Sequence, residues 1–229
     1  MPVSIEVPAY PALVIDGSSS GFFSGVLGSD GIWLSAKKVT EPALESLFKT
    51  VDEILKPAGL ELDAIQSFIY CEGPGSVLGL RLCAMAIETW IRIQSNPVQL
   101  FAYNSLQLMG ADLLLKDKIK DGALLISDWK KDTWNGLKID SDVLDAVRPI
   151  SAVALSHWSG PLYHLPARKG WQKPPDDVIE LNYSPQNLAK LLHFPKLLKS
   201  RQSVELYNSG INSFQKWTPD RHRAAVIPS

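Results

Sequence analysis

The sequence is poor in the residues that carry metal, disulfide and nucleophile chemistry. Its 229 residues include two cysteines and four histidines, and two cysteines give neither a disulfide framework nor a cysteine metal site. No two histidines stand four positions apart, the spacing that places a metal-binding pair on one helix face. No Walker phosphate loop occurs. The stretch 17–21 has the letters Gly-x-Ser-x-Gly, but a strand is expected there rather than the helix that follows a nucleophile elbow. P-loop and nucleophilic mechanisms therefore have no support. We therefore expect no catalytic residue, no metal and no cofactor.

The surroundings of these few residues predict structural roles. Cys71 and Cys83 lie in apolar stretches, which is typical of buried free thiols in a reducing compartment. The histidines are expected at the surface rather than on a metal. They are His157, His164, His193 and His222.

Excess charge and long apolar runs are also missing. The net charge is −1 and the pI about 6.4, a poor basis for gripping nucleic acid alone. No apolar run approaches the roughly 20 residues that span a bilayer, and no basic cluster with an apolar core opens the chain. We expect a cytoplasmic protein with no membrane or DNA partner. The stretch 186–223 is rich in lysine and arginine, which predicts either a solvated surface or a face that contacts RNA within a complex.

What the sequence does contain is an ordered series of strand and helix patterns. Strands are expected at 12–17, 18–27, 31–38, 67–71 and 98–102, and helices at 41–56, 76–95 and 105–116. This β-β-β-α-β-α-β-α order resembles the ribonuclease-H-like lobe that is used twice in the actin, Hsp70 and sugar-kinase (ASKHA) superfamily. The resemblance implies an α/β fold with a mixed five-stranded sheet in the first lobe.

A second copy of the pattern begins at residue 123. Strands are expected at 123–128 and 133–139, so Asp16 and Asp128 each end an apolar strand before a turn. Beyond these, only a strand at 178–181 and a helix over 185–200 are clear, with 207–217 a loop or edge strand. We expect an N-terminal lobe, 1–104, with dimerisation helices, and a C-terminal lobe, 105–229, that is reduced or irregular.

A glycine-rich loop stands between the strand 67–71 and the helix 76–95. Gly73, Gly75 and Gly79 allow a sharp turn and a close backbone approach, and Ser76 is placed to cap the helix. Such a loop can hold a phosphate or can fix the helix on the sheet. The residues alone leave both readings open.

The helix after this loop is apolar on nearly every side. One face can cover the sheet, while the other must meet further helices, either of this chain or of a partner. Arg81 near its start either pairs with Glu72 or faces a docking protein. Trp90 suits an interface anchor and suits the core equally well.

Three motifs resemble the TsaB family. The run Leu13 to Ser18 is similar to the family's first strand, the run Gly73 to Arg81 to its Gly-Pro-Gly-Ser-Phe-Thr-Gly-Leu-Arg loop, and Ile126 to Lys131 to the start of its second lobe. The resemblance implies a non-catalytic subunit that binds TsaD and supports threonylcarbamoylation of the adenosine beside the tRNA anticodon. It also implies contact with TsaE and tRNA through the complex.

In the TsaB family, the first two helices form the bundle used for homodimers or for TsaD. Carried to this chain, the resemblance implies an interface on the helices 41–56 and 76–95. Its candidate residues are Leu44, Leu47, Phe48, Val51, Leu78, Arg81, Leu82, Met85 and Trp90.

The chain departs from the family where hydroxyl groups would contact a nucleotide. Gly17 and Leu78 replace threonines, and Val77 replaces a phenylalanine. These losses favour a scaffold over nucleotide chemistry. Asp16, Ser18 and Asp128 then mark either a vestigial cleft or two capped turns. An ATP-dependent sugar-kinase-like enzyme, with both aspartates in its cleft, and a self-associating homologue without a role in modification are the alternatives.

Overall fold

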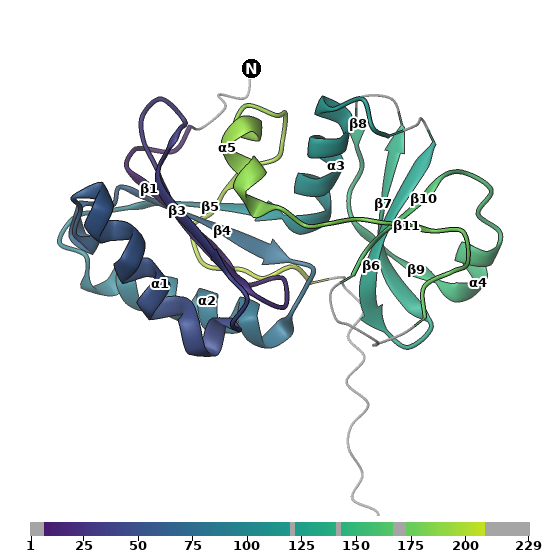
Figure 1. Ribbon diagram of the computed structural model, residues 1–229, viewed down its shortest axis with the longest axis horizontal. Helices are drawn as coiled ribbons and strands as arrows, with labels where there is room; N and C mark the ends of the chain where they lie inside the picture. Colours follow the sequence, from purple (N-terminus) through teal and green to yellow (C-terminus); the bar gives the residue numbers. More distant parts are fainter. Residues whose placement is uncertain (1–6, 120–121, 141–142, 167–172, 209–229) are drawn as a thin grey trace, which may run out of the picture.

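The computed structural model describes residues 7–119, 122–140, 143–166 and 173–208, and has two lobes (Figure 1). Each lobe is built on a mixed β-sheet, and helix α3 lies between the sheets. Within the described ranges, no helix combines the length and the apolar character needed to cross a membrane.

The first sheet has the strand order β12-β5-β4-β1-β2-β3. Strands β1 and β2, and β2 and β3, are antiparallel, whereas β4 is parallel to both β1 and β5. Its first five strands are β1 (Ala12–Asp16), β2 (Phe22–Leu27), β3 (Trp33–Val39), β4 (Ser67–Gly73) and β5 (Gln99–Asn104). β1, β2 and β4 are buried along their whole length, which explains their continuous apolar runs. The sheet has six strands rather than the predicted five, because β12 (Lys199–Ser200) pairs with β5.

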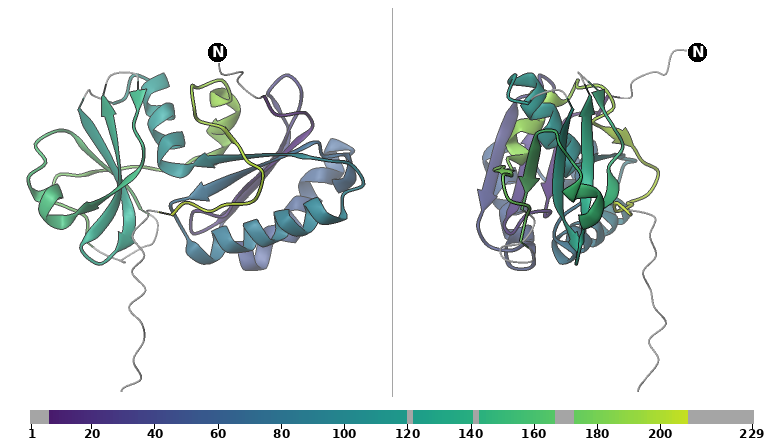
Figure 2. Two further views of the ribbon diagram at one scale, coloured as in Figure 1. Left: turned by 180° about the vertical axis from the view of Figure 1, so that it is seen from behind. Right: turned by 90° about the vertical axis from the view of Figure 1, so that its right-hand side faces the viewer.

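Two helices lie side by side on one face of the first sheet (Figures 1 and 2). Helix α1 (Ala43–Ala58) ends at Gly59, whose left-handed backbone lets its amide donate to the carbonyls of the last turn. Helix α2 (Val77–Ile93) begins after Ser76, whose hydroxyl accepts a hydrogen bond from the amide of Gly79. The predicted cap is therefore confirmed.

Helix α3 (Ser105–Leu115) joins the two lobes. Asn104 caps it by accepting hydrogen bonds from the amides of Leu106 and Gln107. Leu106 and Met109 pack into the core of the second lobe, and Leu108 packs into the core of the first. This helix, rather than α2, is the one that the chain buries on nearly every side.

The second sheet repeats the first around β6. Strand β6 is antiparallel to β7 and parallel to β10, as β1 is to β2 and β4. The elements of this lobe are β6 (Ala123–Lys130), β7 (Thr133–Asp140), β8 (Val143–Leu144), β9 (Arg148–Ser151), α4 (Ala152–Ser156), β10 (Leu162–Leu165) and β11 (Ile179–Glu180). The shared pairing confirms the internal repeat and the two-lobed α/β architecture expected from the sequence.

The long helix expected over 185–200 is wrong. This stretch contains a 3-10 turn η2 (Pro185–Asn187), a single helical turn α5 (Leu188–Leu191) and then β12. Its apolar residues Leu188, Leu191 and Leu197 enter the core of the first lobe, and Pro195 cannot continue a helix. The division at residues 104 and 105 stays a prediction, although residues 188–200, assigned by it to the second lobe, contact the first sheet. Residues 207–208 are irregular, and 209–217 lie outside the described residues.

Candidate functional site

The glycine loop packs against the turn that follows β1. The amide of Ser76 donates to the carbonyl of Ser18 over 2.7 Å, and a Cβ on Gly75 would stand 2.2 Å from that same oxygen. The Oγ of Ser105 donates to the carbonyl of Pro74 over 2.6 Å. Because the loop's closest approaches are to the protein's own backbone, its geometry supports the reading in which it fixes α2 on the sheet.

Two further glycines bring α2 onto this turn. A Cβ on Gly79 would lie 2.2 Å from the carbonyl oxygen of Gly17, and one on Gly17 would lie 2.8 Å from the Sγ of Cys83. A threonine at position 17, as in the TsaB motif, has no room in this arrangement. The departure at Gly17 is therefore coupled to a close contact between the helix and the turn.

Asp16 is buried and fully engaged within the chain. Its Oδ1 accepts from the amide of Ser18 at 2.8 Å, and its Oδ2 accepts from the hydroxyls of Tyr103 at 2.5 Å and Tyr183 at 2.6 Å. The first bond is the turn cap that the sequence predicts. The two tyrosines are additional partners that the sequence did not predict, because they come from β5 and from the segment after β11.

Burial raises the pKa of the Tyr103 and Tyr183 hydroxyls well above the usual value, and the Asp16 carboxylate raises both further. Burial also raises the pKa of Tyr70 to about 12. Both hydroxyl groups on Asp16 therefore remain protonated and can donate at neutral pH.

We expect the protein to lose stability as the pH rises above about 10, the pKa of tyrosine in an unfolded chain. The folded pKa values of Tyr70, Tyr103 and Tyr183 are higher, so the unfolded chain releases these protons first. Stability is complete below that pH and declines towards the folded pKa values. Tyrosinate absorbance and circular dichroism recorded along one alkaline titration test this. Ionisation of all six tyrosines before any loss of structure would contradict it.

Asp128 occupies in the second lobe the place that Asp16 has in the first. It is buried, and its Oδ1 lies 3.1 Å from the Nε2 of His164. The expectation that His164 lies at the surface is wrong, because it belongs to β10 beside β6. His157 and His193 are exposed, while His222 is outside the described residues. Within the described ranges, no group of three or more histidine, cysteine, aspartate or glutamate residues could hold a metal. Cys71 and Cys83 are free and buried, as predicted.

The described residues of both lobes line a small cavity close to these aspartates. The cavity there has a volume of about 10 Å³, enough for about one water molecule. It is lined by Ser18, Ser19, Pro74, Gly75, Ser105, Ser127, Leu165, Pro166 and Tyr183. Ligand pockets typically measure roughly 300 to 1,000 Å³, so this cavity is too small for a nucleotide.

Several large apolar side chains are exposed on α1 and α2 of the first lobe. Leu44 and Phe48 on α1 and Leu78 and Met85 on α2 have exposed fractions between 55% and 68%. Leu82 is half-buried between them, and Arg81 is exposed. We call these six residues the helical face. Three other predicted interface residues, Leu47, Val51 and Trp90, are instead buried in the first lobe's own core.

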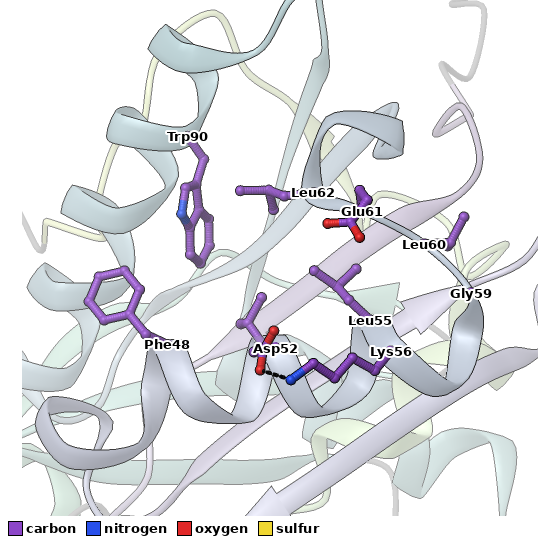
Figure 3. Close-up of a pocket in the computed structure, with 10 residues that line it drawn as sticks. Phe48, Asp52, Leu55, Lys56, Gly59, Leu60, Glu61, Leu62 and Trp90 are labelled. Carbon is purple, nitrogen blue, oxygen red and sulfur yellow. Dashed lines mark hydrogen bonds and ion pairs between the residues drawn. The ribbon is translucent and has the colours of Figure 1, made fainter.

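The aromatic residues at one end of this face are held in place. Phe48 meets Trp90 edge-on with ring centroids 6.0 Å apart, and Trp90 stacks on Phe68 at 6.0 Å. Beside them is a groove of about 410 Å³ (Figure 3). Asp52 and Lys56 form an ion pair of 2.6 Å on its wall. Trp90 is therefore a core residue that contacts Phe48 of the helical face.

Glu72 does not pair with Arg81. Its two carboxylate oxygens bind Lys199 at 2.9 Å and Arg201 at 2.5 Å. These cations belong to the basic stretch 186–223, so part of that charge is used inside the protein. RNA contact by the rest of the stretch stays a prediction.

Comparison with known proteins shows the fold. Neither a family model nor a curated protein matches the sequence. Among solved structures, "YeaZ from Pseudomonas aeruginosa" is similar with a TM-score of 0.60 and 15% identity, covering 80% of this chain and 90% of its own. An "uncharacterized protein with similarity to peptidase YEAZ from Pseudomonas aeruginosa" has a TM-score of 0.62 and 15% identity, with coverages of 86% and 98%. The chain thus has the two-lobed α/β fold of YeaZ, a member of the TsaB family.

Proposed function

We propose that the chain is a diverged TsaB-type scaffold subunit. In this proposal it binds TsaD through the helical face and supports threonylcarbamoylation of the adenosine next to the tRNA anticodon. It contributes no catalytic residue, and TsaE and tRNA meet it through the complex in the cytoplasm. The observation that carries the proposal is an exposed apolar surface on α1 and α2 of a YeaZ-like fold.

The helical face has the composition of a docking surface. Large exposed apolar patches on a domain mark interaction sites, whereas single exposed apolar side chains are common and carry no such meaning. Burying one large apolar side chain contributes about 1.5–3 kcal/mol, so Leu44, Phe48, Leu78 and Met85 together can support a stable complex. Arg81 at its edge supplies a charge for orientation.

The engagement of Asp16 supports a scaffold rather than an enzyme. Its carboxylate already accepts three hydrogen bonds from the chain, and the cavity beside it holds about 10 Å³. A sugar-kinase-like activity would require the Asp16 carboxylate to give up these hydrogen bonds and the cavity to widen. Equilibrium dialysis with Mg-ATP discriminates, because micromolar binding would favour the kinase reading.

Calorimetric titration against TsaD of the same organism tests the proposal. We expect binding by the unmodified protein and at least tenfold weaker binding by Met85→Asp, because a carboxylate would be buried in an apolar contact. Val153→Asp is the matched control, since Val153 is equally exposed but lies on α4 in the second lobe. It should bind like the unmodified protein.

Three outcomes would count against the proposal. The absence of both heat and co-elution with TsaD would exclude the partner. Equal weakening by both substitutions would exclude the helical face. A gene deletion that leaves the threonylcarbamoylated nucleoside in tRNA, measured by mass spectrometry, would favour a self-associating homologue without a role in modification.

A further inference from the structure

The segment after β11 crosses from the second lobe to the first. It starts beside β10, where the amide of Leu181 donates to the carbonyl of His164 over 2.8 Å. It then passes over the junction of the lobes to α5, which lies against the first sheet (Figure 1). We call residues 181–187 the crossing segment.

Three hydrogen bonds between nitrogen and oxygen atoms tie the crossing segment to the first lobe, and the Tyr183 hydroxyl also donates to the Sγ of Cys71 at 4.0 Å. The Nζ of Lys38 donates to the carbonyl of Tyr183 at 2.9 Å, and the Nε1 of Trp33 donates to the carbonyl of Gln186 at 3.0 Å. The third is the bond from the Tyr183 hydroxyl to the Oδ2 of Asp16 at 2.6 Å. The first two reach exposed or half-buried backbone, whereas the third ends on a buried carboxylate.

The bond to Asp16 differs from the others in strength and in place. A hydrogen bond to a charged acceptor is about twice as strong as one between neutral groups, and its strength increases away from water. Tyr183 also lines the narrow cavity between the lobes, together with Gly75 of the first lobe and Ser127 of the second. It therefore bridges the two lobes at the point where they would separate.

We propose that Tyr183 is a latch that holds the two lobes closed without a bound ligand. Two-lobed proteins that close around a ligand commonly do so by hinge motion. In this chain, a hydroxyl of the crossing segment instead links the second lobe to the carboxylate at the end of β1. The lobes then act as one rigid support for α1 and α2. The inference does not depend on which partner, if any, binds the helical face.

The effect of Tyr183→Phe on local opening is measurable by amide hydrogen exchange. Tyr103 still donates to Asp16 in this variant, so the buried carboxylate keeps a partner and each core stays intact. The hydrogen bonds of the Ser18 and Ser76 amides lie within the first lobe but involve Ser18, which lines the cavity between the lobes. These two amides should exchange roughly tenfold faster, as expected for the loss of a hydrogen bond to a charged group. The amides of Gln66 and Leu124 bond to residues that do not line this cavity, Pro11 and Pro161, and should not change.

Tyr163→Phe is the matched control. Its hydroxyl donates to the carbonyl of Lys118 at 3.4 Å, away from the junction, so its loss should leave Ser18 and Ser76 unaffected. Unchanged exchange at the junction in Tyr183→Phe would overturn the latch. Uniform acceleration at all amides, or failure of the variant to fold, would equally overturn it, because both would make Tyr183 a requirement for global stability.

Discussion

Replacing Gly79 with alanine is expected to lower the free energy of unfolding by about 3 kcal/mol or more. This cost is at the upper end of the range for overpacked sites. The new Cβ would stand 2.2 Å from the carbonyl oxygen of Gly17. That oxygen is backbone and cannot move aside as a flexible side chain does. The start of α2 must therefore shift away from the turn after β1, which also disturbs the bond between Ser76 and Ser18.

Urea denaturation of the variant, followed by circular dichroism, measures this loss. Gly59→Ala is the matched control, because a Cβ there meets nothing within 4 Å. Its left-handed backbone alone should cost about 1 kcal/mol. Equal losses in the two variants would show that the contact between Gly17 and Gly79 contributes nothing beyond backbone conformation.

Replacing Glu72 with glutamine is expected to cost about 2 kcal/mol, less than the 3–5 kcal/mol typical of a fully buried pair. The side chain of Glu72 is 5% exposed and binds two cations. Glutamine keeps the shape but removes the charge that offsets Lys199 and Arg201. Because these cations are about one third exposed, they can relax towards water, which limits the cost.

Glu53→Gln provides the comparison for this effect. Glu53 pairs with Lys37 at 2.7 Å on the surface, where an ion pair contributes little. Thermal unfolding should show a clearly lower melting temperature for Glu72→Gln and an unchanged melting temperature for Glu53→Gln. A similar melting temperature for the two variants would mean that the ion cluster at Glu72 does not stabilise the fold.

The first lobe could be predicted from the sequence because its patterns are local. The apolar runs of β1 and β4, the capping serine at position 76 and the helical spacing in α1 each depend on neighbours a few residues away. The role of the glycine loop could not be predicted, because it depends on the carbonyl of Ser18, which is far away in the sequence. The loop's residue types suit a phosphate and a packed backbone equally.

No local sequence pattern predicts that residues 188–200 return to the first lobe. Leu188 and Leu191 lie on the helical turn α5, whereas Leu197 follows irregular backbone, and all three enter the core of the first lobe. The hydroxyl of Tyr183 and the burial of His164 depend in the same way on contacts between distant segments. The spacing predicted the two helices that carry the helical face, α1 and α2. It could not separate Leu47, Val51 and Trp90, which the sheet covers, from Phe48 and Met85.

The pairing of β12 with β5 has a consequence for synthesis on the ribosome. The first sheet receives its sixth strand, and Glu72 its two cations, from residues 199–201. All of the second sheet is translated before these residues emerge. While the second lobe is being synthesised, β5 has no neighbour on one edge, and Glu72 has neither of its two cations. Nascent chains that end before residue 199 therefore have an incomplete first sheet and are the form that a chaperone would bind.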